Sequence, residues 1–155
     1  MRSPRFAYYS LLPEKPEHTG QRIDVFVGFR LESSPDQWWL LAGGDTPAWS
    51  KYAAGIDPVA YLDNVLLTPS PWNALPIDSA PADASMDLNA AITNGSIYIG
   101  YGLRGAVNGS LSASFQEMLD NRRMGRIWFS VHDNAEVCLR YSKIRAKAAA
   151  SAPSQ

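Results

Sequence analysis

Residues Gly95–Val131 have the sequence GSIYIGYGLRGAVNGSLSASFQEMLDNRRMGRIWFSV, in which two strand patterns enclose one helix pattern. Apolar residues alternate with other residues from Ile97 to Tyr101 and again from Ile127 to Val131. This period of two is what a half-buried strand requires. The segment therefore indicates a β-rich domain, and the rest of the chain is expected to supply the remaining strands.

The helix between these two strands has a recognisable start and end. Ser114 and Glu117 have the spacing of a capping box, so we predict that the helix begins at Ser114. Gly125 is suited to end it in the left-handed conformation. The preceding residues, 102–114, are rich in Gly, Asn and Ser and predict an exposed loop.

The other strands follow from alternation interrupted by turn residues. We predict them at Phe6–Leu12, Arg22–Glu32, Gln37–Ala42, Asn64–Thr68, Ala74–Asp78 and Val137–Tyr141, with a long irregular connection from Trp49 to Trp72. In Arg22–Glu32 one face is apolar, and Phe26 is the large apolar residue of the other face. The sequence thus predicts an all-β, antiparallel sandwich of about seven or eight strands, with one short α-helix before the last core strand.

Length and composition limit the possible classes of protein. The 155 residues suit one domain, which we place at residues 1–142, followed by an Ala/Ser/Pro-rich tail or linker at 143–155. The net charge of -1 disfavours nucleic acid as a partner, since no basic field would attract phosphates. No stretch approaches the roughly 18 apolar residues of a membrane span.

The location of the protein is less constrained by the sequence. Cys138 is the single cysteine, so no intramolecular disulfide can form, and this is compatible with either a reducing or an oxidising compartment. The first 18 residues contain no apolar run of a secretory signal. An extracellular or cell-surface location and a cytoplasmic one therefore both stay open.

Several patterns resemble catalytic or cofactor motifs without their context. His132 and Cys138 lie near each other in the sequence, but no spacing indicates a nucleophile–base pair. Gly100, Gly102 and Gly105 have the bare GxGxxG spacing, yet no βαβ unit surrounds them, and we expect glycines that permit a bend. We therefore predict no catalytic residue and no cofactor.

Two groups remain as candidate ligand sites. Asp78, Asp83 and Asp87 could offer oxygen ligands to Ca²⁺, but we expect a solvated acidic loop there, with Asp87 more simply explained as a cap. The candidate contact residues are the tryptophans Trp38, Trp39, Trp72 and Trp128. One of two adjacent tryptophans on a strand must point away from the core. Such a ring can serve a protein interface, stack on a sugar or pack under the long connection.

Taken together, these residues resemble an immunoglobulin-like module of secreted and surface-attached bacterial proteins, of the pilus-associated or adhesin type. The resemblance covers about residues 8–131. It rests on His18, Gly20, Gln21, Ile23–Val27, Trp38–Leu41, Trp49, Asp87–Leu88, Ile97–Gly102 and Phe115–Arg122. It implies a non-catalytic module that forms part of a larger exported protein or assembly.

We therefore expect a non-enzymatic structural or accessory module of a bacterial extracellular assembly, acting through protein contacts or self-association. The alternative is a carbohydrate-binding module that stacks the same aromatic rings on sugar, for which a coplanar row of exposed rings would be the sign. A small hydrolase is the third class. It would need a nucleophile and a base that converge in one pocket.

Overall fold

The computed structural model describes residues 6–53, 55–69, 73–77, 79, 81, 94–105, 109–129 and 141–145, and of 128, 129 and 141–145 only the backbone. The strands are β1 (Phe6–Leu12), β2 (Arg22–Leu31), β3 (Ser34–Ala42), β4 (Ala48–Lys51), β5 (Leu62–Leu66), β6 (Asn73–Pro76), β7 (Gly95–Leu103), β8 (Met124–Phe129) and β9 (Tyr141–Arg145). The helices are the 3-10 turn η1 (Pro16–His18) and α2 (Leu111–Asp120). The all-β fold with a short helix before strand β8 is confirmed.

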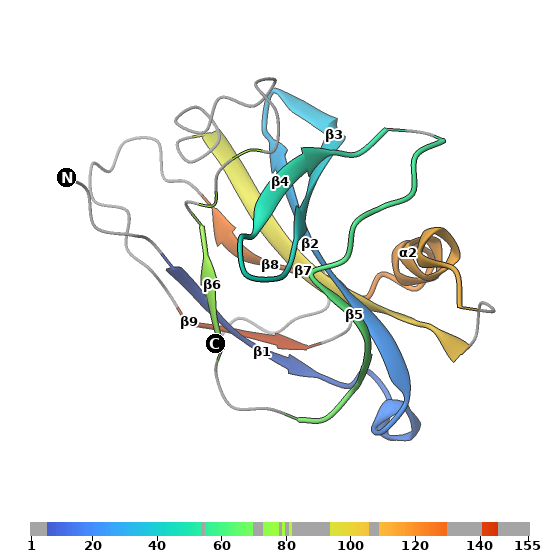
Figure 1. Cartoon of the computed structure of the whole chain (residues 1–155). Coiled ribbons are helices and arrows are strands. Elements are labelled where there is room, and N and C mark those ends of the chain that lie inside the picture. The colour runs from blue at the N-terminus through green and yellow to red at the C-terminus, as the bar shows by residue number, and fades with distance from the viewer. Residues whose placement is uncertain are drawn as a thin grey trace.

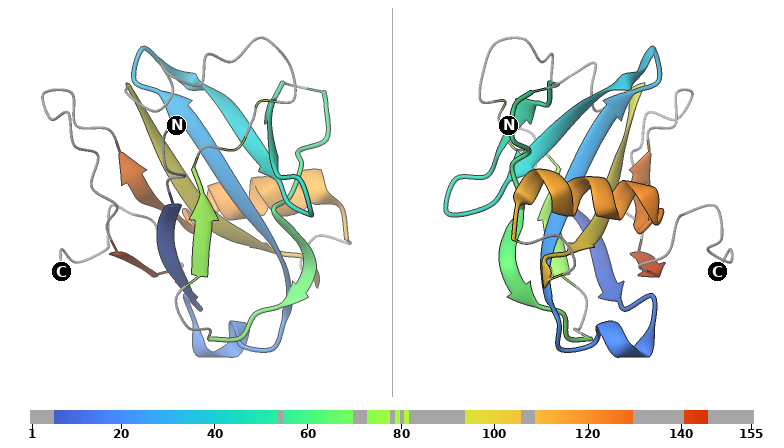
Figure 2. Two further views of the ribbon diagram at one scale, coloured as in Figure 1. Left: turned by 60° about the vertical axis from the view of Figure 1, so that its left-hand side comes forward. Right: turned by 90° about the vertical axis from the view of Figure 1, so that its right-hand side faces the viewer.

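The strands form two sheets, and helix α2 covers the outer face of the larger one (Figures 1 and 2). The six-stranded sheet has the order β4-β3-β2-β7-β8, and β5 continues the β3 edge of β2. The smaller sheet has the order β6-β1-β9. All pairings between these strands are antiparallel except that of β1 with β9.

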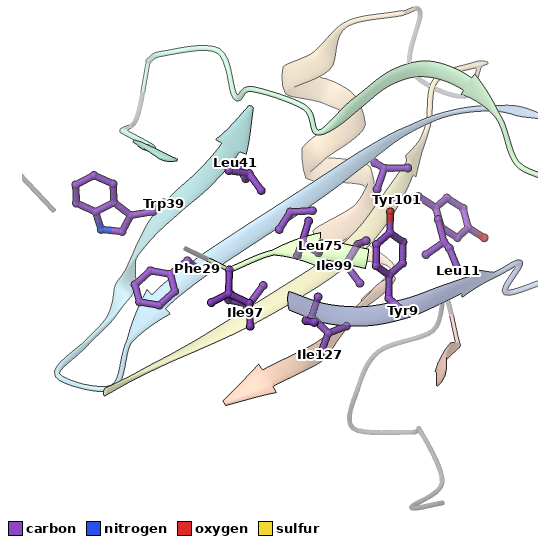
Figure 3. Close-up of a cluster of buried hydrophobic side chains, with 14 of the residues drawn as sticks. Tyr9, Leu11, Phe29, Trp39, Leu41, Leu75, Ile97, Ile99, Tyr101 and Ile127 are labelled. Carbon is purple, nitrogen blue, oxygen red and sulfur yellow. The ribbon is translucent and has the colours of Figure 1, made fainter. Parts of the chain in front are cut away.

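The two faces of β2 and β7 are buried in different ways. The side chains of β2 and β7 that face the smaller sheet form the main core together with Tyr9 and Leu11 of β1. Those of β2 and β7 are Ile23, Val25, Val27, Phe29, Ile97, Ile99 and Tyr101. Figure 3 labels Phe29, Ile97, Ile99 and Tyr101 beside Tyr9 and Leu11. On the opposite face, Phe26 packs with Leu40 and with Phe115 and Met118 of α2. The expected isolation of Phe26 on its face is thus explained by the helix, which supplies its apolar neighbours.

Helix α2 begins and ends at residues other than those that we predicted. Its N-cap is Ser110, whose hydroxyl accepts a hydrogen bond from the backbone N–H of Ala113. Ser114 is buried inside the helix, so the capping box with Glu117 was wrong. The left-handed residue after the helix is Arg122, with φ of 54°, and Gly125 lies in β8.

Glycines in β7 let the helix approach the sheet closely. A Cβ at Gly102 would collide with the backbone carbonyl of Ser114 in α2. A Cβ at Gly100 would collide with the backbone carbonyl of Arg123, just before β8, and would also lie 2.8 Å from the sulfur of Met118. The β2–β7 register is continuous past both positions, so neither marks a bulge in this pairing. The lack of a side chain makes room for α2 at Gly102, and mainly for the Arg123 backbone at Gly100.

Other boundaries also differ from the predictions. The strand expected at Asn64–Thr68 is β5, two residues earlier, and β4 lies where we expected an irregular connection. Residues 130–140, which held the first part of the predicted last strand, lie outside the described residues. Strand β9 crosses the boundary that we placed after residue 142, since Lys143 and Ile144 pair with Ser10 and Leu11 of β1.

Candidate binding site at the end of helix α2

A groove lies where helix α2 ends and stops covering the outer face of the larger sheet. One wall consists of Leu119, Arg122 and Met124, at the end of the helix and the start of β8. The other wall consists of Arg30, Trp38 and Tyr98, from three neighbouring strands. The groove has a volume of about 220 Å³ and is open to solvent.

Trp38 is the outward member of the adjacent tryptophan pair. Its ring lies over Gly28, where a Cβ would come within 2.9 Å of two ring carbons. Its other neighbour is Tyr98, with ring centroids 5.4 Å apart and planes at 76°. Trp39 points to the other side of the sheet and is buried in the main core (Figure 3), so the prediction that it is a contact residue was wrong.

Arg30 packs against both of these aromatic rings. The guanidinium carbon lies 5.0 Å from the centroid of Trp38 and 4.9 Å from that of Tyr98, within the range of a cation–π interaction. One Nη donates to the Tyr98 hydroxyl at 3.0 Å, and the other to the carbonyl of Pro35 at 3.4 Å. The guanidinium is therefore positioned without a carboxylate partner among the described residues.

A second arginine cluster is closed to solvent. The side chain of Arg123 is 3% exposed and forms ion pairs with Glu14, at 3.0 Å, and with Glu117. It also donates to the backbone carbonyl of Tyr101 at 3.2 Å. The hydroxyl of Tyr101 accepts the Glu14 N–H and shares a 2.6 Å hydrogen bond with Nδ1 of His18. This cluster joins η1 and its flanks to β7 and α2.

The titration behaviour of this cluster follows from its burial and pairing. Burial acts to raise the pKa of Glu117, but hydrogen bonds from Arg123 and from the Leu103 N–H outweigh it and hold that pKa below its usual range. Burial raises the pKa of Tyr101. Because each charged group faces a partner and His18 is itself buried, the cluster offers no accessible acid, base or nucleophile.

A third cluster lies near the start of β2, at the end of the strand away from the groove. Oδ1 of the fully buried Asp24 accepts a hydrogen bond from the backbone N–H of Asn64 and is ion-paired with Arg104 at 2.6 Å. Arg104 also pairs with the exposed Asp63. The positive φ of Asn64, 54°, sits where the β2–β5 register shifts. We assign this cluster to folding, since Arg104 and the β5 backbone cover the carboxylate.

Only part of the predicted site lies in the described region. Trp38 is outward as one of the pair had to be, whereas Trp72, Asp78, Asp83, Asp87, His132, Cys138 and the side chain of Trp128 lie outside the described residues. Sequence reasoning missed Arg30, Tyr98 and Arg122. The alternation of β2 and β7 placed Arg30 and Tyr98 on the outer face. Nothing in that alternation indicated that the Arg30 guanidinium contacts the Tyr98 ring.

Two negative findings concern the described residues alone. In that part of the chain no three His, Cys, Asp or Glu side chains come together as a metal site. No helix within it has the length and apolarity needed to cross a membrane.

In comparisons with known proteins, no family description, no curated protein and no solved structure matches this chain.

Proposed function

We propose that this protein is a non-enzymatic binding module that acts through protein contacts at the groove between helix α2 and the Trp38–Arg30–Tyr98 cluster. The observation that carries the proposal is the fixed, partly exposed arrangement of these three side chains. Tryptophan, tyrosine and arginine are the residues most enriched among the energetically dominant contacts of protein interfaces.

Preorganisation supports the same reading. Trp38 is held by Gly28 beneath it and by Tyr98 at its edge, and Arg30 is held by both rings. A partner that contacts these groups would lose little side-chain entropy, because they are already ordered before binding. Flexible surface side chains would lose about 0.5–1.5 kcal/mol each on being ordered at an interface.

The angle between the rings argues against a sugar platform. A carbohydrate-binding surface of the type considered above presents its rings in one plane, and Trp38 and Tyr98 stand at 76° to each other. Arg30 also occupies the space over both rings that a sugar would need. The placement of the module in a bacterial extracellular or surface assembly is part of the proposal and is based on the family resemblance described above.

The mass of the native particle tests this function. We expect material from the source cell to contain the 17.0 kDa chain in a larger assembly, and the Trp38→Ala variant to shift towards the monomer in light scattering. Leu66→Ala is the matched control, since it removes another exposed apolar side chain, 51% accessible, from β5.

A second variant separates lost contact from lost folding. Arg122 is exposed and has a side chain without a partner among the described residues, so Arg122→Glu should leave the fold intact while still weakening the assembly. A wild-type chain that is monomeric in its source, or an assembly that tolerates both Trp38→Ala and Arg122→Glu, would contradict the proposal.

A further inference from the structure

We propose that the groove recognises an acidic segment of the protein partner, in which a carboxylate is bound by Arg30 and Arg122 and a neighbouring aliphatic side chain packs on Leu119 and Met124. This inference rests on the proposed function, since it names the chemistry of the partner at the same surface. It is carried by the charge, the apolar lining and the size of the groove.

The charges in the groove have one sign. Of the residues that line it, Arg30 and Arg122 are charged, and both are positive. A further arginine, Arg126, is the cross-strand neighbour of Tyr98. The nearby Asp120 accepts a hydrogen bond from Gln116, four residues earlier on the helix. A negatively charged ligand therefore has complementary charge here, which steers association and selects among partners.

Arg30 retains donors for such a ligand. A guanidinium has five N–H groups, and the two hydrogen bonds of Arg30 go to Pro35 and Tyr98. Its fork geometry matches a carboxylate, and its contacts with both rings restrict its rotation. Arg122 brings a second guanidinium from the opposite wall, on a backbone held by its bond to the Leu119 carbonyl.

The rest of the lining is apolar, which narrows the ligand class. Leu119 and Met124 are partly buried against the helix-side core and expose the remainder of their surface to the groove. A bare inorganic anion would leave this surface unused, and a neutral sugar could accept hydrogen bonds but would leave the two guanidinium charges without an opposite charge. A volume of about 220 Å³ suits one or two amino-acid side chains better than a drug-sized ligand, which needs roughly 300 Å³ or more.

Nucleic acid is the competing anionic polymer, because stacked bases and phosphates also use aromatic rings and arginines. The whole chain, however, has a net charge of -1 and so lacks the extended basic surface that tracks a phosphate backbone. Arg30 already lies against both rings and Trp38 packs edge-to-face with Tyr98, so these two rings do not form a shared flat surface on which bases could stack. We therefore favour a peptide.

Fluorescence anisotropy with the full chain tests the proposal. The probe is a fluorescein-labelled decapeptide of alternating aspartate and leucine, compared with peptides in which asparagine or lysine replaces each aspartate. We expect binding of the aspartate peptide alone, and about tenfold weaker binding to Arg122→Gln, because a charge-assisted hydrogen bond is lost. Arg22→Gln is the matched control, since Arg22 is an exposed arginine at the other end of β2.

The remaining outcomes are decisive. Equal binding of the asparagine peptide, equal weakening by Arg22→Gln, or tighter binding of a ten-nucleotide single strand than of the aspartate peptide would overturn the acidic-peptide inference. If the peptide does not bind but the native assembly still depends on Trp38, the ligand class is wrong and the contact surface stands. If the assembly is also insensitive to Trp38, both proposals fail.

Discussion

Strand β7 carries two tyrosines that each lie under an arginine, and the two pairs differ in burial and in charge compensation. Arg123 lies 5.2 Å from the ring centroid of Tyr101, and Arg30 lies 4.9 Å from that of Tyr98. Arg123 is buried with two carboxylates, whereas Arg30 is partly exposed and has no carboxylate partner in the described chain. The same pairing serves the fold in one case and remains open to a ligand in the other.

The difference arises from the period of the strand. Residues three apart on a strand point to opposite faces, so Tyr101 enters the main core while Tyr98 lies on the outer face. A charge brought into the core must be compensated there, because desolvation of an ion costs several kcal/mol. Glu14 and Glu117 provide that compensation. On the outer face water solvates Arg30, and no internal carboxylate is required.

Among the variants that test this comparison, Arg123→Met is expected to have the largest effect on stability. The change leaves Glu14 and Glu117 without their partner, although each keeps 14% of its side chain exposed, so we expect a loss of about 3 kcal/mol in the free energy of unfolding. Urea denaturation measures it. The double variant Arg123→Met, Glu117→Gln should recover part of the loss. A single variant as stable as the wild type would show that the closed cluster does not hold the fold.

Gly102→Ala tests whether the close approach of α2 to β7 positions Glu117 next to Arg123. The new Cβ would collide with the Ser114 carbonyl and force α2 away from β7, which we expect to cost about 2 kcal/mol by overpacking. Gly105→Ala is the control, since nothing lies within 4 Å of its Cβ position. The difference in urea midpoint between the two variants isolates the close approach, and equal midpoints would contradict it.

Acid should lower the stability of the Arg123–Glu14–Glu117 cluster by less than Gly102→Ala does, because protonated Glu117 can still form hydrogen bonds. The folded-state pKa of Glu117 is lowered, so the folded state binds this proton less tightly than the unfolded state. Its contribution is therefore complete above the unfolded pKa of about 4.3 and is lost as the pH falls through the folded pKa. The stability difference between wild type and Glu117→Gln should shrink on acidification below pH 4. A constant difference would disprove this coupling.

The open pair should contribute least to stability. Arg30→Met removes two cation–π contacts and the hydrogen bonds to Tyr98 and Pro35, and we expect a loss of about 1 kcal/mol in the free energy of unfolding. The same urea measurement applies. A loss as large as that of Arg123→Met would mean that Arg30 stabilises the fold as much as Arg123 does. The proposed difference between the two arginines would then be wrong.

The strands were largely predictable, because each depends on local alternation. β1 was placed correctly from Phe6 to Leu12, and the central part of β7 followed from Ile97 to Tyr101. The helix start was wrong because Ser110 and Ser114 both precede apolar residues at helical spacing. Burial of Ser114 against Gly102 is a contact across the fold, and no local pattern contains it.

The candidate site shows the same division. The sequence by itself determined that β2 and β7 are two-faced strands, that one tryptophan of the pair at 38 and 39 points outward, and that Arg30 lies on the face opposite the main core. Those properties depend only on the period of a strand. The tertiary structure decided which arginine is neutralised and which is open. That outcome depends on where α2 ends and which side chains it brings beside each tyrosine, and these are contacts between residues distant in sequence.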